Sequence, residues 1–222
     1  CMRSGRVIMR TLMMIGAAVG LLLIPGAAMA NWVDNFDSYA LGSINLQGGW
    51  KGWDNVPAAA GDVSSTFSLS PANSQKIQLG ADSVHLYSGY TSGQWTYTAM
   101  QYIPTAFTGQ SYFILLNQYN DLGPYNWSAQ VRFDAALNTV RSEFTTGTDD
   151  GVAVPLVREA WVEIRDVIDF TADTQSLYYN NQLLVTKSWK QGCSGTGGIA
   201  NLAAVDLFAN NATAVYYDNM SL

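Results

Sequence analysis

Short runs of strand-forming residues recur along most of this chain, and their spacing is the feature that most constrains its fold. Gln94–Ile103 and Ser111–Tyr119 are typical, since both are rich in aromatic and β-branched side chains. Gly, Pro, Asn, Asp or Ser bounds each run, and no segment after residue 30 has the apolar period of an amphipathic helix. This pattern predicts an antiparallel β-sandwich or a β-barrel. The other expected strands are Trp127–Phe133, Thr139–Phe144, Trp161–Phe170, Ser176–Tyr179, Gln182–Val185, Ala204–Phe208 and Ala214–Leu222.

The first thirty residues have the features of a secretory signal peptide. Arg3, Arg6 and Arg10 precede an apolar run over residues 12–24, and Ala28-Met29-Ala30 supplies small residues for cleavage. The alternative is an uncleaved anchor, but the run is shorter than the roughly 20 apolar residues that span a bilayer. We therefore expect a signal peptide over 1–30 and one domain over 31–222. We also expect no membrane span after cleavage, and a secreted or cell-surface location.

Charge and composition exclude several function classes. Three of the 11 Lys and Arg residues lie in the leader and none of the 17 acids does, so residues 31–222 carry a net charge of −9. An acidic chain is a poor partner for nucleic acid or anionic membranes. One histidine and one cysteine, Cys193, remain after the leader, which excludes His/Cys zinc clusters and an internal disulfide. Calcium, which prefers oxygen ligands, is not excluded.

Strand parity predicts which side chains share a face. In 127–134, Trp127, Ala129, Val131 and Phe133 should face one way, with Ser128, Gln130, Arg132 and Asp134 opposite. In 161–170, Asp166 falls on the same face as Val162, Ile164 and Ile168. Either Asp166 is a buried functional carboxylate, or a bulge turns it outward; we favour the bulge because an unpaired buried charge is costly.

Several segments resemble the concanavalin A-like (laminin G-like) jelly-roll domains of secreted bacterial proteins. The resemblance is carried by the opening Asp34-Asn35-Phe36-Asp37-Ser38-Tyr39, by Gln47-Gly48-Gly49-Trp50, by Trp161-Val162-Glu163-Ile164, by Asn180-Asn181-Gln182-Leu183-Leu184, and by the closing Val215-Tyr216-Tyr217-Asp218-Asn219. It implies an all-β fold of two antiparallel sheets arranged as a jelly-roll sandwich. One sheet would be curved, with a concave face that in relatives binds or cleaves polysaccharide. The resemblance implies no reaction for this chain.

The sequence does not supply the residue arrangement that a retaining glycosidase or a polysaccharide lyase needs. Retaining glycosidases need carboxyl groups about 5–5.5 Å apart. Glu163 and Asp169 share a face but are six residues apart, about 20 Å along a strand, and Glu163 and Asp166 point to opposite faces. A polysaccharide lyase needs an Arg to neutralise a uronate and a Tyr or His for proton transfer. Such an enzyme would use Arg132 or Arg141 with a tyrosine. Cross-strand ion pairs on a solvated face are the simpler explanation for Arg141.

Aromatic residues beside amides indicate a sugar-binding groove. Trp50 and Trp53 lie in a Gly-rich polar segment, and Tyr119, Tyr125 and Trp127 flank another loop. Flat rings match the C–H faces of sugars, and amides match sugar hydroxyls. Closure of the sandwich ends by these rings is the competing explanation. The expected groove comprises Trp50, Trp53, Asn117, Tyr119, Tyr125, Trp127, Gln130 and Arg132.

A structural calcium ion is the one cofactor that the sequence suggests. Asp37 is near the chain start and Asp218 near its end, so pairing of the first and last strands would bring both carboxylates to one rim. The sequence as a whole thus predicts an exported, non-catalytic carbohydrate-binding or surface-adhesion domain whose partner is a polysaccharide or glycan. The alternative is a polysaccharide-degrading enzyme, a glycoside hydrolase or a lyase, on the same fold.

Overall fold

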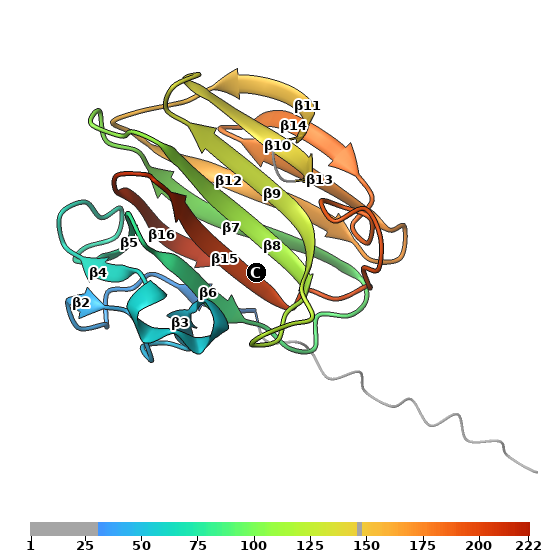
Figure 1. Ribbon diagram of the computed structural model, residues 1–222, viewed down its shortest axis with the longest axis horizontal. Coiled ribbons are helices and arrows are strands. Elements are labelled where there is room, and N and C mark those ends of the chain that lie inside the picture. Colours follow the sequence, from blue (N-terminus) through green and yellow to red (C-terminus); the bar gives the residue numbers. More distant parts are fainter. Residues whose placement is uncertain (1–30, 146–147) are drawn as a thin grey trace, which may run out of the picture.

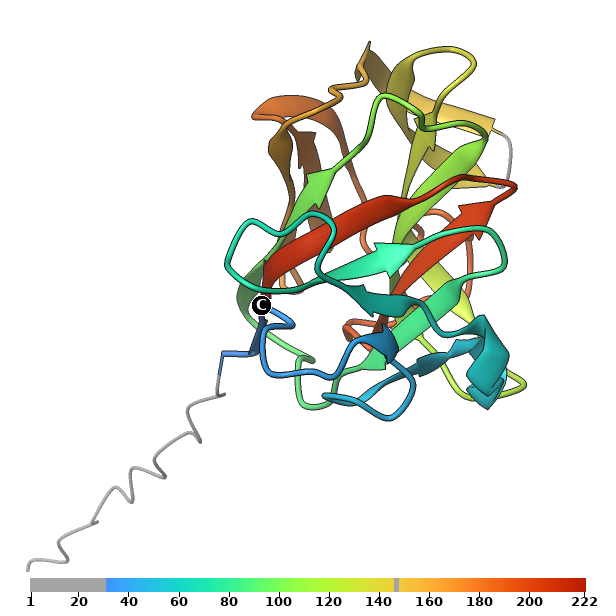
Figure 2. The ribbon, with the colours of Figure 1, turned by 90° about the vertical axis from the view of Figure 1, so that its left-hand side faces the viewer.

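The computed structural model describes residues 31–145 and 148–222; the expected signal peptide lies outside the described residues. Sixteen strands of this part of the chain form two antiparallel sheets that pack face to face (Figures 1 and 2). The first sheet runs in the order β14 (Gln182–Lys187), β13 (Thr174–Tyr179), β12 (Trp161–Asp169), β7 (Gln94–Tyr102), β16 (Val215–Ser221), β5 (Ser74–Ile77), β4 (Asp62–Ser64) and β2 (Gly42–Ser43), with β1 (Val33–Asp34) also pairing with β16. The second runs β11 (Thr148–Pro155), β10 (Thr139–Thr145), β9 (Asn126–Asp134), β8 (Gln110–Gln118), β15 (Ala204–Asn210), β6 (Asp82–Leu86) and β3 (Trp50–Gly52).

Strands from opposite ends of the chain are interleaved in both sheets. In the nine-stranded sheet β16 lies between β7 and β5, and in the seven-stranded sheet β15 lies between β8 and β6. The inner faces enclose one large apolar core that includes Ile44, Phe113, Ile164 and Val205. Burying each such side chain stabilises the fold by about 1.5–3 kcal/mol. The two-sheet jelly-roll sandwich expected from the sequence is therefore confirmed.

The nine predicted strand segments all form strands, with ends shifted by at most a few residues. Asn180 and Asn181 make the tight hairpin between β13 and β14, and both have positive φ, 48° and 59°. The expected pairing of the chain's ends is confirmed, because Asp34 of β1 lies opposite Met220 of β16. Strand signals were missed in β1 to β5, which have two to four residues each, and in β11, whereas β6 overlaps the strand-like sequence Val84-His85-Leu86-Tyr87. Two short 3₁₀ turns are the only helices in the described residues: η1 (Trp53–Asn55) and η2 (Pro57–Ala59). No helix there has the length and apolarity to cross a membrane.

A β-bulge in β9 corrects the predicted orientation of Trp127. Leu115 of β8 lies opposite Ala129, but the next residue, Leu116, lies opposite Trp127, so Ser128 is the extra residue. Ala129, Val131 and Phe133 face the core as predicted. The bulge turns the Trp127 side chain to the other face of the sheet, where it packs beside Tyr112 and Ile114.

Asp166 also differs from the favoured expectation. β12 pairs without a break with both neighbours, so that Asp166 lies opposite Tyr97 of β7 and Leu177 of β13. No bulge turns the side chain outward; it is fully buried, and neither carboxylate oxygen has a hydrogen-bond partner. Burial raises the pKa of Asp166 to about 7. The bulge prediction was therefore wrong, and the carboxyl group lies inside the sandwich, away from the outer faces.

Candidate functional site

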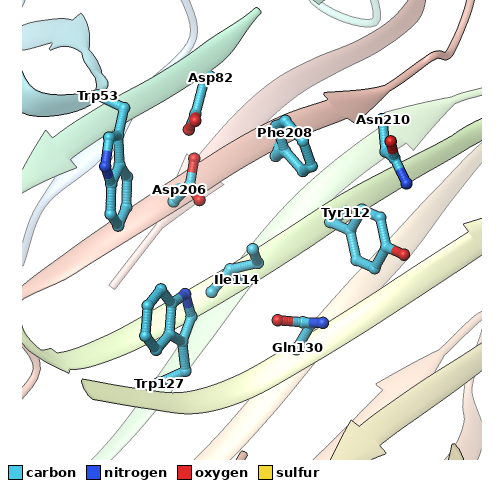
Figure 3. Close-up of a pocket in the computed structure, with 9 residues that line it drawn as sticks. All are labelled: Trp53, Asp82, Tyr112, Ile114, Trp127, Gln130, Asp206, Phe208 and Asn210. Atoms are coloured by element: carbon cyan, nitrogen blue, oxygen red, sulfur yellow. The ribbon is translucent and has the colours of Figure 1, made fainter. Parts of the chain in front are cut away.

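The outer face of the seven-stranded sheet carries a furrow of about 290 Å³ (Figure 3). This volume is at the lower end of small-molecule sites, which span about 300–1,000 Å³. Aromatic, amide and carboxyl groups line the furrow: Trp53, Asp82, Tyr112, Ile114, Trp127, Gln130, Asp206, Phe208 and Asn210. Every one of them except Trp53 comes from β6, β15, β8 or β9, so strand pairing fixes their positions.

Strand register arranges these side chains in two rows across the sheet. One row runs Asp82, Phe208, Tyr112 and Arg132 across β6, β15, β8 and β9. The neighbouring row, two residues along each strand, runs Val84, Asp206, Ile114 and Gln130. The rings of Tyr112 and Phe208 stack with centroids 5.9 Å apart. Because alternate residues share a face, the rows make one continuous surface.

Two partly buried indoles form one end of the furrow. The rings of Trp53 and Trp127 have centroids 6.2 Å apart, and their planes differ by 10°. Figure 3 shows them entering the furrow from opposite sides, Trp53 from the β6 side and Trp127 from β9. Tyr125 packs against Trp53 at 4.8 Å and against Trp127 at 5.9 Å. The parallel planes offer a flat apolar platform of the kind that sugar rings contact.

A hydrogen-bonded turn holds Trp53 in place. Asp54, the next residue, has φ of 53°, and its carboxylate accepts hydrogen bonds from the Tyr125 hydroxyl at 2.5 Å and the Leu122 backbone N–H at 2.9 Å. These bonds lower the pKa of Asp54. The Asp54 backbone N–H donates to the Tyr119 hydroxyl at 2.9 Å. The 119–125 loop therefore positions Trp53 through both the backbone and the side chain of Asp54.

Trp127 is held from its other side by the 193–194 segment. Its backbone N–H donates to the Ser194 hydroxyl at 2.8 Å, and its carbonyl accepts from the N–H groups of Cys193 and Ser194 at 3.0 Å. The bulge at Ser128 removes regular pairing at this point of β9. The 193–194 segment thus satisfies backbone groups that the bulge leaves without a ladder partner.

Asp82 and Asp206 form a carboxyl pair on the floor of the furrow. Asp206 is 3% exposed, and the two side chains approach within hydrogen-bonding distance. Figure 3 shows their carboxyl groups facing each other between Trp53 and Phe208. Burial, and then the neighbouring charge of Asp82, raise the pKa of Asp206; burial also raises the pKa of Asp82. Two carboxyl groups this close can share a proton, which relieves the repulsion between two negative charges.

Arg132 is neutralised within the protein. Its guanidinium donates to the fully buried Glu143 and, at 2.6 Å, to Asp149. Gln130 donates its amide N–H to the second oxygen of Glu143, and Arg141 pairs with Asp149. Both arginines are thus engaged with acids of β10 and β11. Neither is free to neutralise a substrate carboxylate without losing these bonds.

Two predicted groove residues lie elsewhere. Trp50 is fully buried in the core, and its indole N–H donates to the carboxylate of Asp34 at 2.9 Å. Asn117 is also fully buried; its amide donates to Asn126 and Ser128 at 2.8 Å, and its oxygen accepts from the Ile199 N–H. The structure therefore corrects the prediction for both residues. The Gly-rich segment suggested exposure of Trp50, but a buried acceptor 16 residues earlier satisfies its indole.

The other predicted residues gather around the furrow. Trp53, Trp127 and Gln130 line it directly. Tyr119 and Tyr125 lie behind Trp53 and support it through the contacts described above, and Arg132 adjoins Tyr112 in the same row. The sequence missed the other six lining residues, which are Asp82, Tyr112, Ile114, Asp206, Phe208 and Asn210. Asp206 and Phe208 fall inside a predicted strand, but their neighbour Asp82 comes from a distant strand, and only the sheet order brings the three together.

The calcium expectation gains no support from the contacts of Asp37 and Asp218. Asp218 is fully buried and accepts hydrogen bonds from the backbone N–H groups of Leu69 and Ser70 at 2.7 and 3.0 Å. Asp37 accepts from the Asn73 N–H at 3.0 Å. Within residues 31–145 and 148–222, no group of three or more His, Cys, Asp or Glu side chains could hold a metal ion. Both carboxylates act as acceptors for neighbouring loops.

Comparison with known proteins identifies the fold. No protein-family model matches the sequence, and no curated protein matches it. Among solved structures, a sialidase superposes with a TM-score of 0.56 at 8% identity, over 86% of this chain and 18% of the sialidase chain. The cellulose-induced protein Cip1 superposes with a TM-score of 0.52 at 14% identity, over 85% and 95% of the two chains. The alginate lyase Aly36B, in a complex with an alginate tetrasaccharide, gives 0.51 at 12% identity, over 86% and 95%.

These similarities define the class of fold. The chain is a concanavalin A-like jelly-roll sandwich of two antiparallel sheets, as the resemblance in sequence implied. Identities of 8–14% show shared architecture and no more. The sialidase is also a far longer chain, of which this protein spans 18%. Function therefore has to be argued from the furrow itself.

Proposed function

We propose that this protein is an exported carbohydrate-binding domain that holds a polysaccharide or glycan in the furrow without cleaving it. The paired indoles of Trp53 and Trp127 carry this proposal. Both are partly exposed, nearly parallel, and fixed by loops on either side, as a preformed sugar platform requires. Asn210 supplies an amide oxygen beside the rings, where a sugar hydroxyl would lie, while the Gln130 amide is held by Glu143 and the Cys193 thiol.

The geometry of the acids supports binding over hydrolysis. Retaining glycosidases keep their two carboxyl groups about 5–5.5 Å apart and inverting enzymes about 6.5–9.5 Å apart. Asp82 and Asp206 approach within hydrogen-bonding distance, which leaves no room for a sugar carbon or a water between them. The pairing of Arg132 and Arg141 with acids likewise disfavours a lyase that neutralises a uronate.

Similar folds add independent support for a glycan partner. An alginate lyase in complex with an alginate tetrasaccharide and a transglycosylase in complex with NAG share this architecture. Such folds include enzymes, so an assay must separate binding from turnover. Incubation of the protein with a panel of polysaccharides should show retention on at least one of them, without new reducing ends or unsaturated products. Appearance of either product would favour the alternative, a glycoside hydrolase or polysaccharide lyase.

A further inference from the structure

The floor of the furrow holds two carboxyl groups that no protein cation pairs with. Asp82 and Asp206 are the only charged residues that line it. Throughout the part of the chain that the structure describes, neither carboxylate forms an ion pair with Lys, Arg or His. Oδ1 of each accepts no hydrogen bond from a protein N–H or O–H donor. Buried carboxyl groups in folded proteins are normally satisfied. Asp166 also lacks partners but lies inside the sandwich, whereas Asp82 and Asp206 line a furrow that a ligand can enter.

A second buried acid on the same face shows the usual arrangement. Glu143 is fully buried, and both its oxygens are engaged, one by Arg132 and the other by Gln130. Asp206 is nearly as buried, at 3% exposed, and lies three strands away on β15. The guanidinium of Arg132 thus neutralises Glu143 on this face of the sheet, whereas no Lys or Arg side chain neutralises the carboxyl groups in the furrow. The furrow is the end that is open to a ligand.

We propose that the furrow selects a glycan that carries a protonated amine, and that the carboxyl groups of Asp82 and Asp206 receive this ammonium group. This inference rests on the proposed function, because it specifies the class of sugar that the same furrow binds. An ammonium group has three N–H donors and no acceptor, so it can donate to both carboxyl groups at once. An unsubstituted sugar hydroxyl has one donor and leaves the negative charge unbalanced.

The aromatic residues around the pair suit a cation as well as a sugar ring. Figure 3 shows Asp206 between the rings of Trp53 and Phe208. Ring faces attract a nearby ammonium group, and more strongly where water is partly excluded. The apolar C–H face of the same sugar would lie on Trp127. A single amino-sugar unit of a glycan could therefore contact both the carboxyl pair and the aromatic rings.

A divalent metal fits the pair less well. Calcium takes six to eight oxygen ligands. The furrow lining offers the two aspartates, the amide oxygens of Gln130 and Asn210 and the Tyr112 hydroxyl, and the Gln130 Oε1 already lies 3.8 Å from the Cys193 thiol. The titratable and charged groups around the pair are Asp54 beside Trp53, Tyr112 on β8, Arg132 on β9 and Lys51 on β3. Arg132 is paired with Glu143, and Lys51 is paired with Asp121 at 2.5 Å. None of these adds a cation to the furrow.

The test is a calorimetric comparison of three tetrasaccharides at about pH 6: β-1,4-linked glucosamine, its N-acetylated form, and β-1,4-linked glucose. The glucosamine tetramer should bind about tenfold or more tightly than either neutral tetramer, the effect of one or more charge-assisted hydrogen bonds. Its binding should release protons from the carboxyl pair, seen as a heat that changes with the buffer's ionisation enthalpy. Addition of EDTA should leave the preference unchanged.

Three variants assign the effect. D206N and D82N keep side-chain size and remove one charge each, and each should weaken binding of the glucosamine tetramer about tenfold while sparing the neutral tetramers. E163Q removes one charge from β12, on the opposite sheet, and should change nothing. If D206N does not fold, D82N still tests the proposal, since Asp82 is the more exposed residue of the pair.

The outcomes separate this inference from the proposed function. Equal affinity for the three tetramers, or a preference that survives both D82N and D206N, would overturn the amine proposal. Equal affinity for the three tetramers that W53A abolishes would overturn only the amine proposal and would keep the carbohydrate-binding function. Absence of retention on every glycan of the panel would overturn both.

Discussion

The indole of Trp127 lies 6.2 Å from that of Trp53, with the two ring planes 10° apart, although they come from a β-bulge and a 3₁₀ turn that are distant in the sequence. Trp127 reaches the outer face of the sheet because Ser128 is an extra residue in β9. Trp53 reaches it because Asp54 ties η1 to the 119–125 loop. The platform thus depends on two local irregularities that meet above a regular sheet.

Removal of Trp127 should weaken glycan binding and leave the fold intact. W127A takes away one partly exposed ring of the platform, and we expect a loss of about 1 kcal/mol or more, about fivefold in Kd. W161A is the matched control, because Trp161 is also partly buried but lies on β12 of the opposite sheet. Affinity gels containing the retained polysaccharide measure both. Equal retardation of W127A and the unmodified protein would remove Trp127 from the site.

Loss of the Tyr125 hydroxyl should loosen Trp53 without removing any ring. Y125F deletes the 2.5 Å hydrogen bond to Asp54, while the Leu122 N–H continues to hold that carboxylate. One net hydrogen bond is worth about 0.5–1.5 kcal/mol, so glycan binding should weaken by about threefold. Y178F, on β13 of the other sheet, controls for the loss of a hydroxyl. Unchanged affinity in Y125F would show that Trp53 is positioned by other contacts.

The buried carboxyl group of Asp166 should make stability fall as pH rises. Its pKa is raised to about 7 by burial, against about 3.9 in the unfolded chain. Between these values the folded state binds more protons than the unfolded state, so the free energy of unfolding decreases with pH across the window. D166N removes the titrating carboxyl group and therefore its pH-dependent contribution to the free energy of unfolding. Its stability relative to the unmodified protein should therefore rise between pH 4 and pH 8, by up to about 4 kcal/mol at about 1.4 kcal/mol per unit.

Urea unfolding at several pH values measures this difference. E163Q is the control, since Glu163 lies on the outer face of the same strand beside Arg165. Parallel pH curves for D166N and the unmodified protein would mean that Asp166 has an ordinary pKa in the folded state.

Chelation should leave the fold unchanged if Asp218 acts only as a hydrogen-bond acceptor. Its oxygens are engaged by the backbone N–H groups of Leu69, Ser70 and Asn219 and by the Ser70 hydroxyl. EDTA or added calcium should therefore not shift the Tm. A Tm that rises with calcium and falls with EDTA would restore the metal site that the sequence suggested for Asp37 and Asp218.

Local patterns predicted the sheet architecture well and the site only in part. Strands such as β7 and β12 could be predicted from their aromatic and β-branched composition. The hairpin could be predicted from Asn180-Asn181, because Asn tolerates positive φ. Strand alternation assigned Trp127 to the wrong face, because a bulge shifts the register of β9 by one residue. It assigned Asp166 to the correct, inner face, where we had expected a bulge to turn the side chain outward. The furrow needed information that no local pattern contains. Asp82 meets Asp206 only because β6 and β15, distant in sequence, are neighbours in the sheet.

The most direct test of a sugar platform follows the indole N–H resonances of the seven tryptophans during titration with a glycan that the protein retains. Single Trp→Phe variants assign each signal. The account predicts saturable shifts for Trp53 and Trp127, and none for the core residues Trp50 and Trp189, whose N–H groups donate to Asp34 and to the Asn201 carbonyl. Signals of Trp53 and Trp127 that stay fixed while the glycan binds would contradict it.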